Sequence, residues 1–282
     1  KQSDLYKNNP VFQAEYDNYL KEDWGGTFED VKYLIELLES PQLIPTPTST
    51  PISTVTQGTG NAGGLVTLQN LDDFGFYMGS TPSKRQANTE ELNRVLRKYN
   101  INKPLRIAFF LGNVAKESWF GSRTLEKFNG SSPETYFNNK YSNNSDLGNQ
   151  GGNDGELFRG AGYIQMTGRN NYQEFANYIK DQSIMKDGYR LIGGVYNKPV
   201  SQIKSGDLGV IDIGKYAWES AGWFWVYGNA IGKNLNTLAD NKDYNGVLNG
   251  INSKDKGSLQ ERNSNINKIY KILTGSELGL PT

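Results

Sequence analysis

The chain has 282 residues, with 30 Lys and Arg against 30 Asp and Glu, so its formal net charge is zero. This balance gives no overall electrostatic attraction to nucleic acid or to an anionic lipid surface. No segment approaches the roughly 20 apolar residues that a membrane-spanning helix needs. We therefore expect no nucleic-acid partner and no membrane insertion. The length suits one sizeable domain with an appendage, or two small domains.

Cysteine and histidine are both absent from the sequence. Their absence excludes disulfides, cysteine nucleophiles, Ser-His-Asp triads and nearly all zinc sites. Acid–base chemistry must therefore use Asp, Glu, Lys or Tyr, and carboxylates are the expected choice.

Three segments follow one another along the chain. Residues 1–40 predict two short helices of unknown role, the second with one apolar face. Residues 41–64 are rich in Pro, Thr, Ser and Gly, which is typical of a linker. We therefore place a domain boundary there and expect the main domain over residues 65–282.

The main domain has a mostly helical pattern from its first residues. Asn88 and Thr89 are expected to cap one helix. Pro104 is expected at the first position of a strongly apolar helix that runs to Phe120. Residues 129–158 are rich in Asn, Ser and Gly and predict a long surface loop, whose length favours a functional role.

Further helices are expected over residues 213–227, over 235–247 and from 258 onward. Ser258 and Glu261 have capping-box spacing at the start of the last helix, and Gly275 is expected to end it. The tryptophans of the first of these helices are expected in the core rather than as platforms for sugars; they are Trp218, Trp223 and Trp225.

A glycine-rich run extends from Arg159 to Tyr172, with three glycines in nine positions. Such a backbone lets a ligand approach closely, and the run also carries Gln165 and Thr167 just before a helical pattern begins. This edge suits an extended polar ligand. Thr167 is equally open to a role as a helix cap, and Gln165 to one that only satisfies backbone groups.

Glu117 lies near the end of the apolar helix. Its helical neighbours at i−3, i−4 and i−7 are Val114, Asn113 and Phe110, so the carboxyl projects from a largely apolar face. Burial there is expected to raise its pKa, as a general acid needs.

Glu126 follows nine residues later. On a continuous helix this separation would be about 13 Å at 1.5 Å per residue, whereas carboxyl pairs that cleave glycosidic bonds lie about 5 to 9.5 Å apart. The helix must therefore break between the two glutamates, and Gly121-Ser122 is a suitable place.

A plain alternative is that Glu117 is an ordinary helix-end acid and Glu126 a solvated loop charge, because most charged residues lie on surfaces. Four other acids compete for the second role; they are Glu134, Asp146, Asp154 and Glu156.

Taken together, these segments resemble glycoside hydrolase family 19, the chitinase and endolysin group with a lysozyme-like fold. The match is ordered and covers residues 66–274. The matching motifs are Ala108–Ser118 for the first catalytic helix, Arg123–Asn129 for the second acid, Phe158–Arg169 for the glycine-rich signature, and then Ser220–Trp225, Leu238–Asp240 and Gly250–Asn252.

The resemblance implies an inverting mechanism without metal or cofactor. Glu117 would protonate the leaving oxygen, Glu126 would act as general base on the attacking water, and Thr167 would help to hold that water. Four further residues match positions that line the family's substrate cleft; they are Gln165, Asn171, Asn252 and Arg262.

The sequence also departs from the family pattern. Lys116 stands where many relatives have His, and Ala161 replaces a common Arg of the glycine-rich signature. Ser253-Lys254 replaces the usual Gly-Gly after Asn252. None of these changes removes a catalytic carboxylate.

The resemblance implies a mainly α, two-lobed, lysozyme-like domain with a substrate cleft that hydrolyses β-1,4 bonds in an N-acetylhexosamine polymer. Peptidoglycan is the first expected substrate, as in cell-wall lysis by an endolysin, and chitin is the alternative. A second alternative is a catalytically silent glycan-binding or structural module. We expect an extracytoplasmic location, secreted, at the cell wall or on a virion, with residues 1–64 as part of a larger secretion or virion protein.

Overall fold

The computed structural model describes residues 65–77, 79, 81–130, 132–196 and 210–282. The expected N-terminal helices of residues 1–40 and the linker of residues 41–64 lie outside the described residues. All described residues belong to one unit of the chain, Asn61–Thr282.

The described part of the chain is mostly helical, as expected. Its α-helices are α4 Leu68–Phe74, α5 Pro82–Lys98, α6 Pro104–Ser118, α7 Pro133–Tyr141, α8 Asp154–Leu157, α9 Arg169–Ile179, α10 Ile184–Asp187, α11 Tyr189–Ile192, α12 Ala217–Trp223, α13 Leu235–Asp240, α14 Tyr244–Asn252 and α15 Leu259–Thr274. Short 3-10 turns cover Ser145–Leu147 and Lys256–Ser258, and the π-helix η3 covers Phe224–Gly228. Strands β1 Gly194–Tyr196 and β2 Val210–Ile213 pair in antiparallel orientation.

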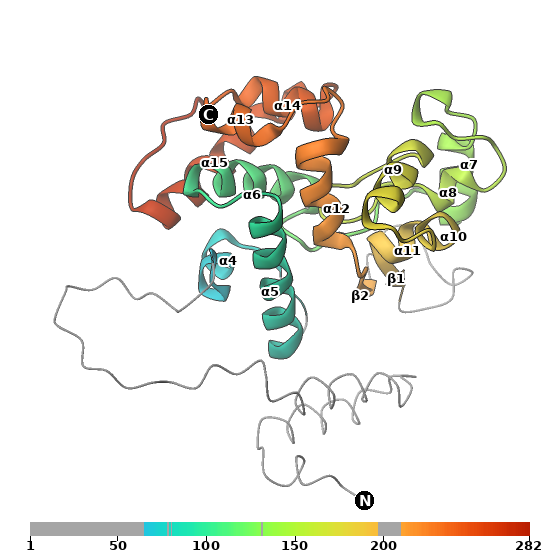
Figure 1. Ribbon diagram of the computed structural model, residues 1–282, viewed down its shortest axis with the longest axis horizontal. Coiled ribbons are helices and arrows are strands. Elements are labelled where there is room, and N and C mark those ends of the chain that lie inside the picture. The colour runs from blue at the N-terminus through green and yellow to red at the C-terminus, as the bar shows by residue number, and fades with distance from the viewer. Residues whose placement is uncertain (1–64, 78, 80, 131, 197–209) are drawn as a thin grey trace, which may run out of the picture. The chain divides into compact units, whose positions relative to one another are not determined.

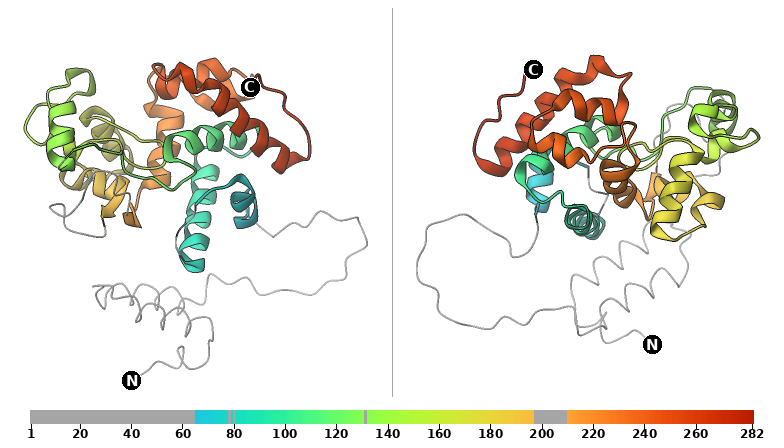
Figure 2. Two further views of the ribbon diagram at one scale, coloured as in Figure 1. Left: turned by 180° about the vertical axis from the view of Figure 1, so that it is seen from behind. Right: turned by 45° about the horizontal axis from the view of Figure 1, so that its top comes forward.

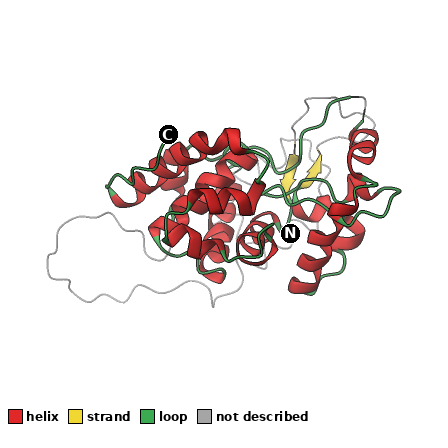
Figure 3. Cartoon of the chain, turned by 90° about the horizontal axis from the view of Figure 1, so that it is seen from above, coloured by secondary structure: helices red, strands yellow, loops and turns green. Residues whose placement is uncertain are grey.

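The helices form two groups (Figures 1 and 2). Helices α4–α6 and α13–α15 make up one group, and α7–α11 with the strand pair make up the other; Figure 3 shows the same division from above. Helix α12 lies between them. The two-lobed helical arrangement expected from the resemblance is therefore confirmed. Among the described residues, no helix has the length and apolar character to cross a membrane.

Helix α6 is buried almost all round. It begins at Pro104, as predicted. It ends at Ser118, two residues before the predicted end, because Trp119 and Phe120 adopt left-handed backbone angles with φ near +52° and +53°. Gly121 continues this turn with φ of +79°. The predicted break between Glu117 and Glu126 is thus confirmed.

Helix α5 begins earlier than predicted. Its N-cap is Thr81, whose hydroxyl accepts a hydrogen bond from the backbone N–H of Lys84, and Pro82 takes the first helical position. Asn88 and Thr89 therefore lie inside the helix and not at its start. The Asn88 side chain instead bonds the hydroxyl of Tyr163 and the indole N–H of Trp218, two buried aromatic residues.

The predicted surface loop over residues 129–158 is wrong, because it contains α7, a 3-10 turn and α8. The Ser132 hydroxyl caps α7 and Pro133 opens it. The rings of Phe128, Phe137 and Tyr141 pack in one small apolar cluster. Burial of these rings outweighs the Asn-rich composition that predicted a loop.

The C-terminal helices differ from the prediction in three places. The helix expected over residues 213–227 begins only at Ala217, because Ile213 ends strand β2, and it continues from Phe224 as the π-helix η3. Residues 235–247 form α13 and part of α14, because the chain turns at Lys242 with φ of +56°. The predicted capping box at Ser258 is absent, because both of its side chains have other partners. The Ser258 hydroxyl bonds Arg262 and Asp255, and Glu261 pairs with Lys116. The predicted stop at Gly275 is confirmed. The three tryptophans lie in the core as expected, with Trp218, Trp223 and Trp225 at most 3% exposed.

Helices α6 and α15 pack closely against each other at Gly112. A β-carbon there would lie 2.5 Å from Cγ1 of Ile266 and 3.0 Å from its backbone nitrogen. We expect Gly112→Ala to lower the free energy of unfolding by about 1–3 kcal/mol, because overpacking a buried contact forces the helices apart. Urea unfolding measures this loss. Gly257→Ala is the control, since no atom lies within 4 Å of its β-carbon; equal stability of the two variants would contradict the close packing.

Candidate active site

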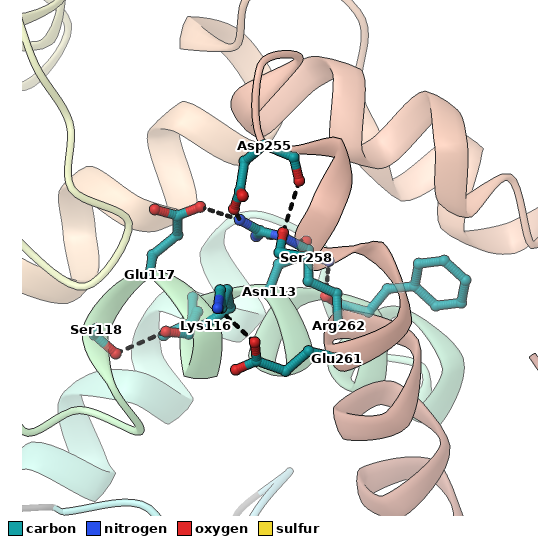
Figure 4. A network of polar contacts seen from close by, with 10 residues as sticks. Asn113, Lys116, Glu117, Ser118, Asp255, Ser258, Glu261 and Arg262 are labelled. Atoms are coloured by element: carbon teal, nitrogen blue, oxygen red, sulfur yellow. Dashed lines mark hydrogen bonds and ion pairs between the residues drawn. The ribbon is translucent and has the colours of Figure 1, made fainter. Parts of the chain in front are cut away.

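Glu117 lies in the last turn of α6, where it meets the guanidinium of Arg262 from α15 (Figure 4). Nη2 of Arg262 donates to Oε1 of Glu117 at 2.6 Å and to Oδ2 of Asp255 at 2.9 Å. The Arg262 side chain is only 2% exposed, and that of Glu117 is 15% exposed. One buried cation thus holds two carboxylates side by side.

Two neutral groups fix the Arg262 guanidinium from behind. Its Nε donates to the hydroxyl of Ser258 at 2.8 Å, and its Nη1 donates to Oδ1 of Asn113 at 3.1 Å. The resemblance implied that Arg262 lines a cleft. In this structure its guanidinium is buried and donates to Glu117, so it orients that carboxyl.

Burial raises the pKa of Glu117, and Arg262 opposes that rise without cancelling it. The negative charge of Asp255 raises the pKa further, while Lys116 lowers it. The raised pKa expected from the apolar face of α6 is therefore confirmed. Lys116, the departure from the family pattern, directs its ammonium to Glu261.

Glu126 lies where the chain pairs with the glycine-rich run. Its backbone N–H donates to the carbonyl of Gly160 at 2.9 Å, and its Oε2 accepts from the N–H of Gly160 at 3.0 Å. Its Oε1 accepts from Nζ of Lys140 and from the hydroxyl of Tyr141, each at 2.8 Å. Both carboxylate oxygens are thus fixed by donors.

Lys140 and Tyr141 come from α7 and were missed by the sequence analysis, because their segment was predicted as a loop. Burial and the charge of Glu126 raise the pKa of Tyr141 to about 12, although Lys140 opposes the rise. The pKa of Lys140 is raised by its hydrogen bonds to Glu126 and Tyr141, against the effect of burial. Both groups therefore hold their protons and donate to Glu126 near neutral pH.

The glycine-rich run supplies the other polar groups around Glu126. A β-carbon on Gly160 would lie 2.8 Å from Oε2 of Glu126 and 3.3 Å from Oε1 of Gln165, so a larger residue here would displace the Glu126 carboxylate. The hydroxyl of Thr167 donates to the carbonyl of Gln165, and Asn171 donates to the carbonyl of Thr167. The structure thus places the Gln165 side chain close to Glu126 and ties the Thr167 and Asn171 side chains to the backbone of the same run.

The sequence also left plain structural roles open for Thr167 and Gln165 in the glycine-rich run, and the structure separates the two cases. Thr167 is not the helix cap, because Gly168 occupies the N-cap of α9. Gln165 does satisfy a backbone group, since its amide donates to the carbonyl of Gly162. Ala161 is fully buried, and its backbone forms β-bridges with Leu125 and Met166.

The four acids that competed with Glu126 for the second catalytic role lie in different surroundings from it. Asp154 forms a two-pronged ion pair with Arg169, which lowers the pKa of Asp154 in spite of its burial. Burial raises the pKa of Glu156, whose carboxylate accepts from Tyr189. Glu134 and Asp146 are exposed.

Asn252 lies exposed at the end of α14. Its carbonyl accepts from the N–H of Asp255 at 3.0 Å, which begins the turn that brings Asp255 to Arg262. Among the described residues, no group of three or more Asp, Glu, His or Cys side chains could hold a metal ion.

Replacement of Asp255 tests the electrostatic link between Asp255 and Glu117, which share Arg262. We expect Asp255→Asn to lower the pKa of Glu117, because it removes a nearby negative charge and leaves Glu117 as the one carboxylate of the described residues paired with Arg262. Titration of the glutamate side-chain carbons by NMR measures the shift. Glu277→Gln, which replaces a 69% exposed acid, should leave it unchanged; an unchanged or raised pKa in Asp255→Asn would contradict the link.

No protein-family model matches the chain. Its fold is similar to that of chitinase C from Streptomyces griseus HUT6037, with a TM-score of 0.53 and 17% identity over 78% of this chain and 98% of that one. A bacterial family 19 chitinase is similar with a TM-score of 0.51 and 17% identity over 77% and 98% of the two chains. A substituted form of chitinase C gives a TM-score of 0.52. The chain therefore has the fold of the bacterial family 19 chitinases.

Proposed function

We propose that residues 65–282 form an inverting glycoside hydrolase that cleaves β-1,4 bonds in an N-acetylhexosamine polymer. One observation carries this proposal: the two glutamates have opposite surroundings. Burial raises the pKa of Glu117, which suits a group that must donate a proton near neutral pH. Glu126 lies in an ion pair with Lys140 and accepts hydrogen bonds at both of its oxygens, which suits a group that must accept a proton.

In the proposed reaction, the Glu117 carboxyl donates its proton to the glycosidic oxygen as the bond between that oxygen and the anomeric carbon breaks. The Glu126 carboxylate takes a proton from a water molecule that attacks the anomeric carbon from the opposite face of the sugar. Thr167 helps to hold this water. Such a displacement inverts the configuration of the anomeric carbon.

The surrounding groups act through these two carboxylates. Arg262 orients Glu117, and Lys140 with Tyr141 orients Glu126, since each donates directly to the carboxylate. Because these donors already hold the carboxylates in position, the site needs little reorganisation during the reaction.

Three side chains are proposed to contact the glycan directly. Gln165 and Asn171 come from the glycine-rich run next to Glu126, and the exposed Asn252 comes from the end of α14. Their amides offer both donors and acceptors, which suits the hydroxyl and acetamido groups of an N-acetylhexosamine.

Peptidoglycan is the first proposed substrate, because the nine-residue spacing of the two glutamates resembles that of phage endolysins and bacterial wall-lytic domains. Chitin is the alternative, and the similar solved structures described above are those of chitinases. A silent glycan-binding or structural module is the second alternative. We also propose an extracytoplasmic location, with residues 1–64 as part of a larger secretion or virion protein.

Glu117→Gln tests the role of the general acid. We expect it to lower kcat by about 100-fold or more, since it removes the transferable proton. The amide keeps an oxygen that can accept from Arg262, so the thermal unfolding midpoint should stay close to that of the parent chain. Glu277→Gln is the control for loss of an acidic side chain. A near-parental rate in Glu117→Gln would refute the assignment.

The configuration of the first product tests the mechanism. We expect proton NMR of the early reaction to show the α-anomer from a β-linked oligomer, because water attacks from the face opposite the leaving group. An initial β-anomer would indicate retention and would remove the proposed role of Glu126.

The substrate is tested by two assays on the same preparation. Loss of turbidity of purified bacterial walls, without cleavage of chitin oligomers, is the expected result, and the reverse pattern would favour chitin. No cleavage of either would favour the silent module. Mass spectrometry of the products separates hydrolysis, which adds water, from the anhydro-sugar product of a lytic transglycosylase.

A further inference from the structure

The connection between Glu117 and Glu126 carries an exposed tryptophan. Trp119 is 60% exposed, more than any other large apolar side chain of the described residues. The guanidinium carbon of Arg123 lies 3.4 Å from the centre of its ring. Because Arg123 covers one face, the exposed area of the indole is on the other face and the edge.

The backbone at Trp119 is strained. Its φ of +52° and ψ of +58° are left-handed, and Phe120 follows with φ of +53°. Bulky residues rarely adopt this conformation. Hydrogen bonds from Phe120 N–H to Ala115, from Tyr77 N–H to Phe120 and from Gly121 N–H to the Ser118 hydroxyl hold the turn in place.

Stability does not account for a tryptophan at this position. A glycine would adopt the same backbone without strain, and an exposed contact between a cation and an aromatic ring is only a weak stabiliser. Strained residues that persist in a structure are concentrated at functional sites. The exposed indole of Trp119 is therefore available for a contact outside the fold.

Arg123 differs from most other arginines of the described residues in the groups that it contacts. Arg106, Arg169 and Arg262 each lie in an ion pair with a carboxylate. Within the described part of the chain Arg123 has no such partner, and its buried Nε has no hydrogen-bond acceptor. Burial lowers the pKa of Arg123, because removal from water disfavours the charged form. Pairing of this guanidinium with an anion would offset that cost.

We propose that Trp119 and Arg123 form a binding subsite for a carboxylate-bearing glycan. The free face of the indole packs against the apolar C–H face of a sugar ring, and the edge of the stacked guanidinium donates two parallel hydrogen bonds to a carboxylate. Peptidoglycan has carboxylates on its peptides and on unsubstituted lactyl groups, whereas chitin has none. The inference rests on the proposed function, because it assigns the substrate class of that site.

Binding measurements separate the subsite from the catalytic residues. The full 282-residue chain with Glu117→Gln is titrated calorimetrically with peptidoglycan glycan strands stripped of peptide, whose lactyl groups are free carboxylates. The second ligand is the same strands with these carboxylates amidated. We expect tighter binding of the free-carboxylate strands. Arg123→Ala should raise their Kd about tenfold or more, as for loss of a charge-assisted pair, and abolish the preference between the two ligands.

Trp119→Gly tests the other half of the subsite. It should weaken binding of both strands while the thermal unfolding midpoint stays equal or rises, because the backbone strain is relieved. Two controls should leave both Kd values unchanged. Arg190→Ala removes an exposed arginine that also lies over a ring, that of Tyr189, and Tyr227→Ala removes a ring that is 56% exposed.

Two results would overturn the subsite: equal binding of the free and amidated strands by the parent chain, or an unchanged preference in Arg123→Ala. If Arg123→Ala unfolds, Arg123→Lys keeps the charge but loses the two-pronged donor, and it must still weaken the preference. Hydrolysis is measured separately with the parent chain, which keeps Glu117. A chain that binds free carboxylates through Arg123 but cleaves nothing would refute the proposed function and leave the subsite standing.

Discussion

The buried guanidinium of Arg262 is the interaction on which the arrangement of the site depends. It joins α6 to α15 and holds Glu117 next to Asp255. A buried cation that lost its carboxylate partners would be strongly destabilising, so the helices and the acid are fixed together. Gly112 makes this possible, because the absence of a β-carbon lets Ile266 of α15 lie against α6.

The same fold gives its two glutamates different environments. Glu117 is held in a mostly apolar part of α6, and burial outweighs the attraction of Arg262 in setting its pKa. Glu126 is fixed by the backbone of Gly160 and by two donors from α7. A difference of this kind between two acids is how proteins assign proton donor and proton acceptor. The strained turn after Ser118 separates the two environments and carries Trp119.

The sequence predicts those parts of the site that depend on local pattern. Pro104 marks the start of α6, and the apolar spacing of that helix predicts the burial of Glu117. The sequence also predicts a glycine-rich backbone open to close approach, although the group that approaches Gly160 is the Glu126 carboxylate. It does not predict α7, because Asn-rich composition favours a loop until the packing of its aromatic rings is known. Lys140 and Tyr141 were missed for that reason. The burial of Arg262 depends on contacts with Asn113, which lies 149 positions away in sequence.

The central claim is that Glu117 is a buried acid whose protonated form carries the reaction. The most direct measurement compares its pKa, from NMR titration of the carboxyl carbon in the free protein, with the alkaline limb of kcat/KM. We predict that both lie at the same pH, above the ordinary range of a glutamic acid, and that activity falls as pH rises through it. An ordinary or lowered pKa for Glu117, or an alkaline limb at a different pH, would contradict the account.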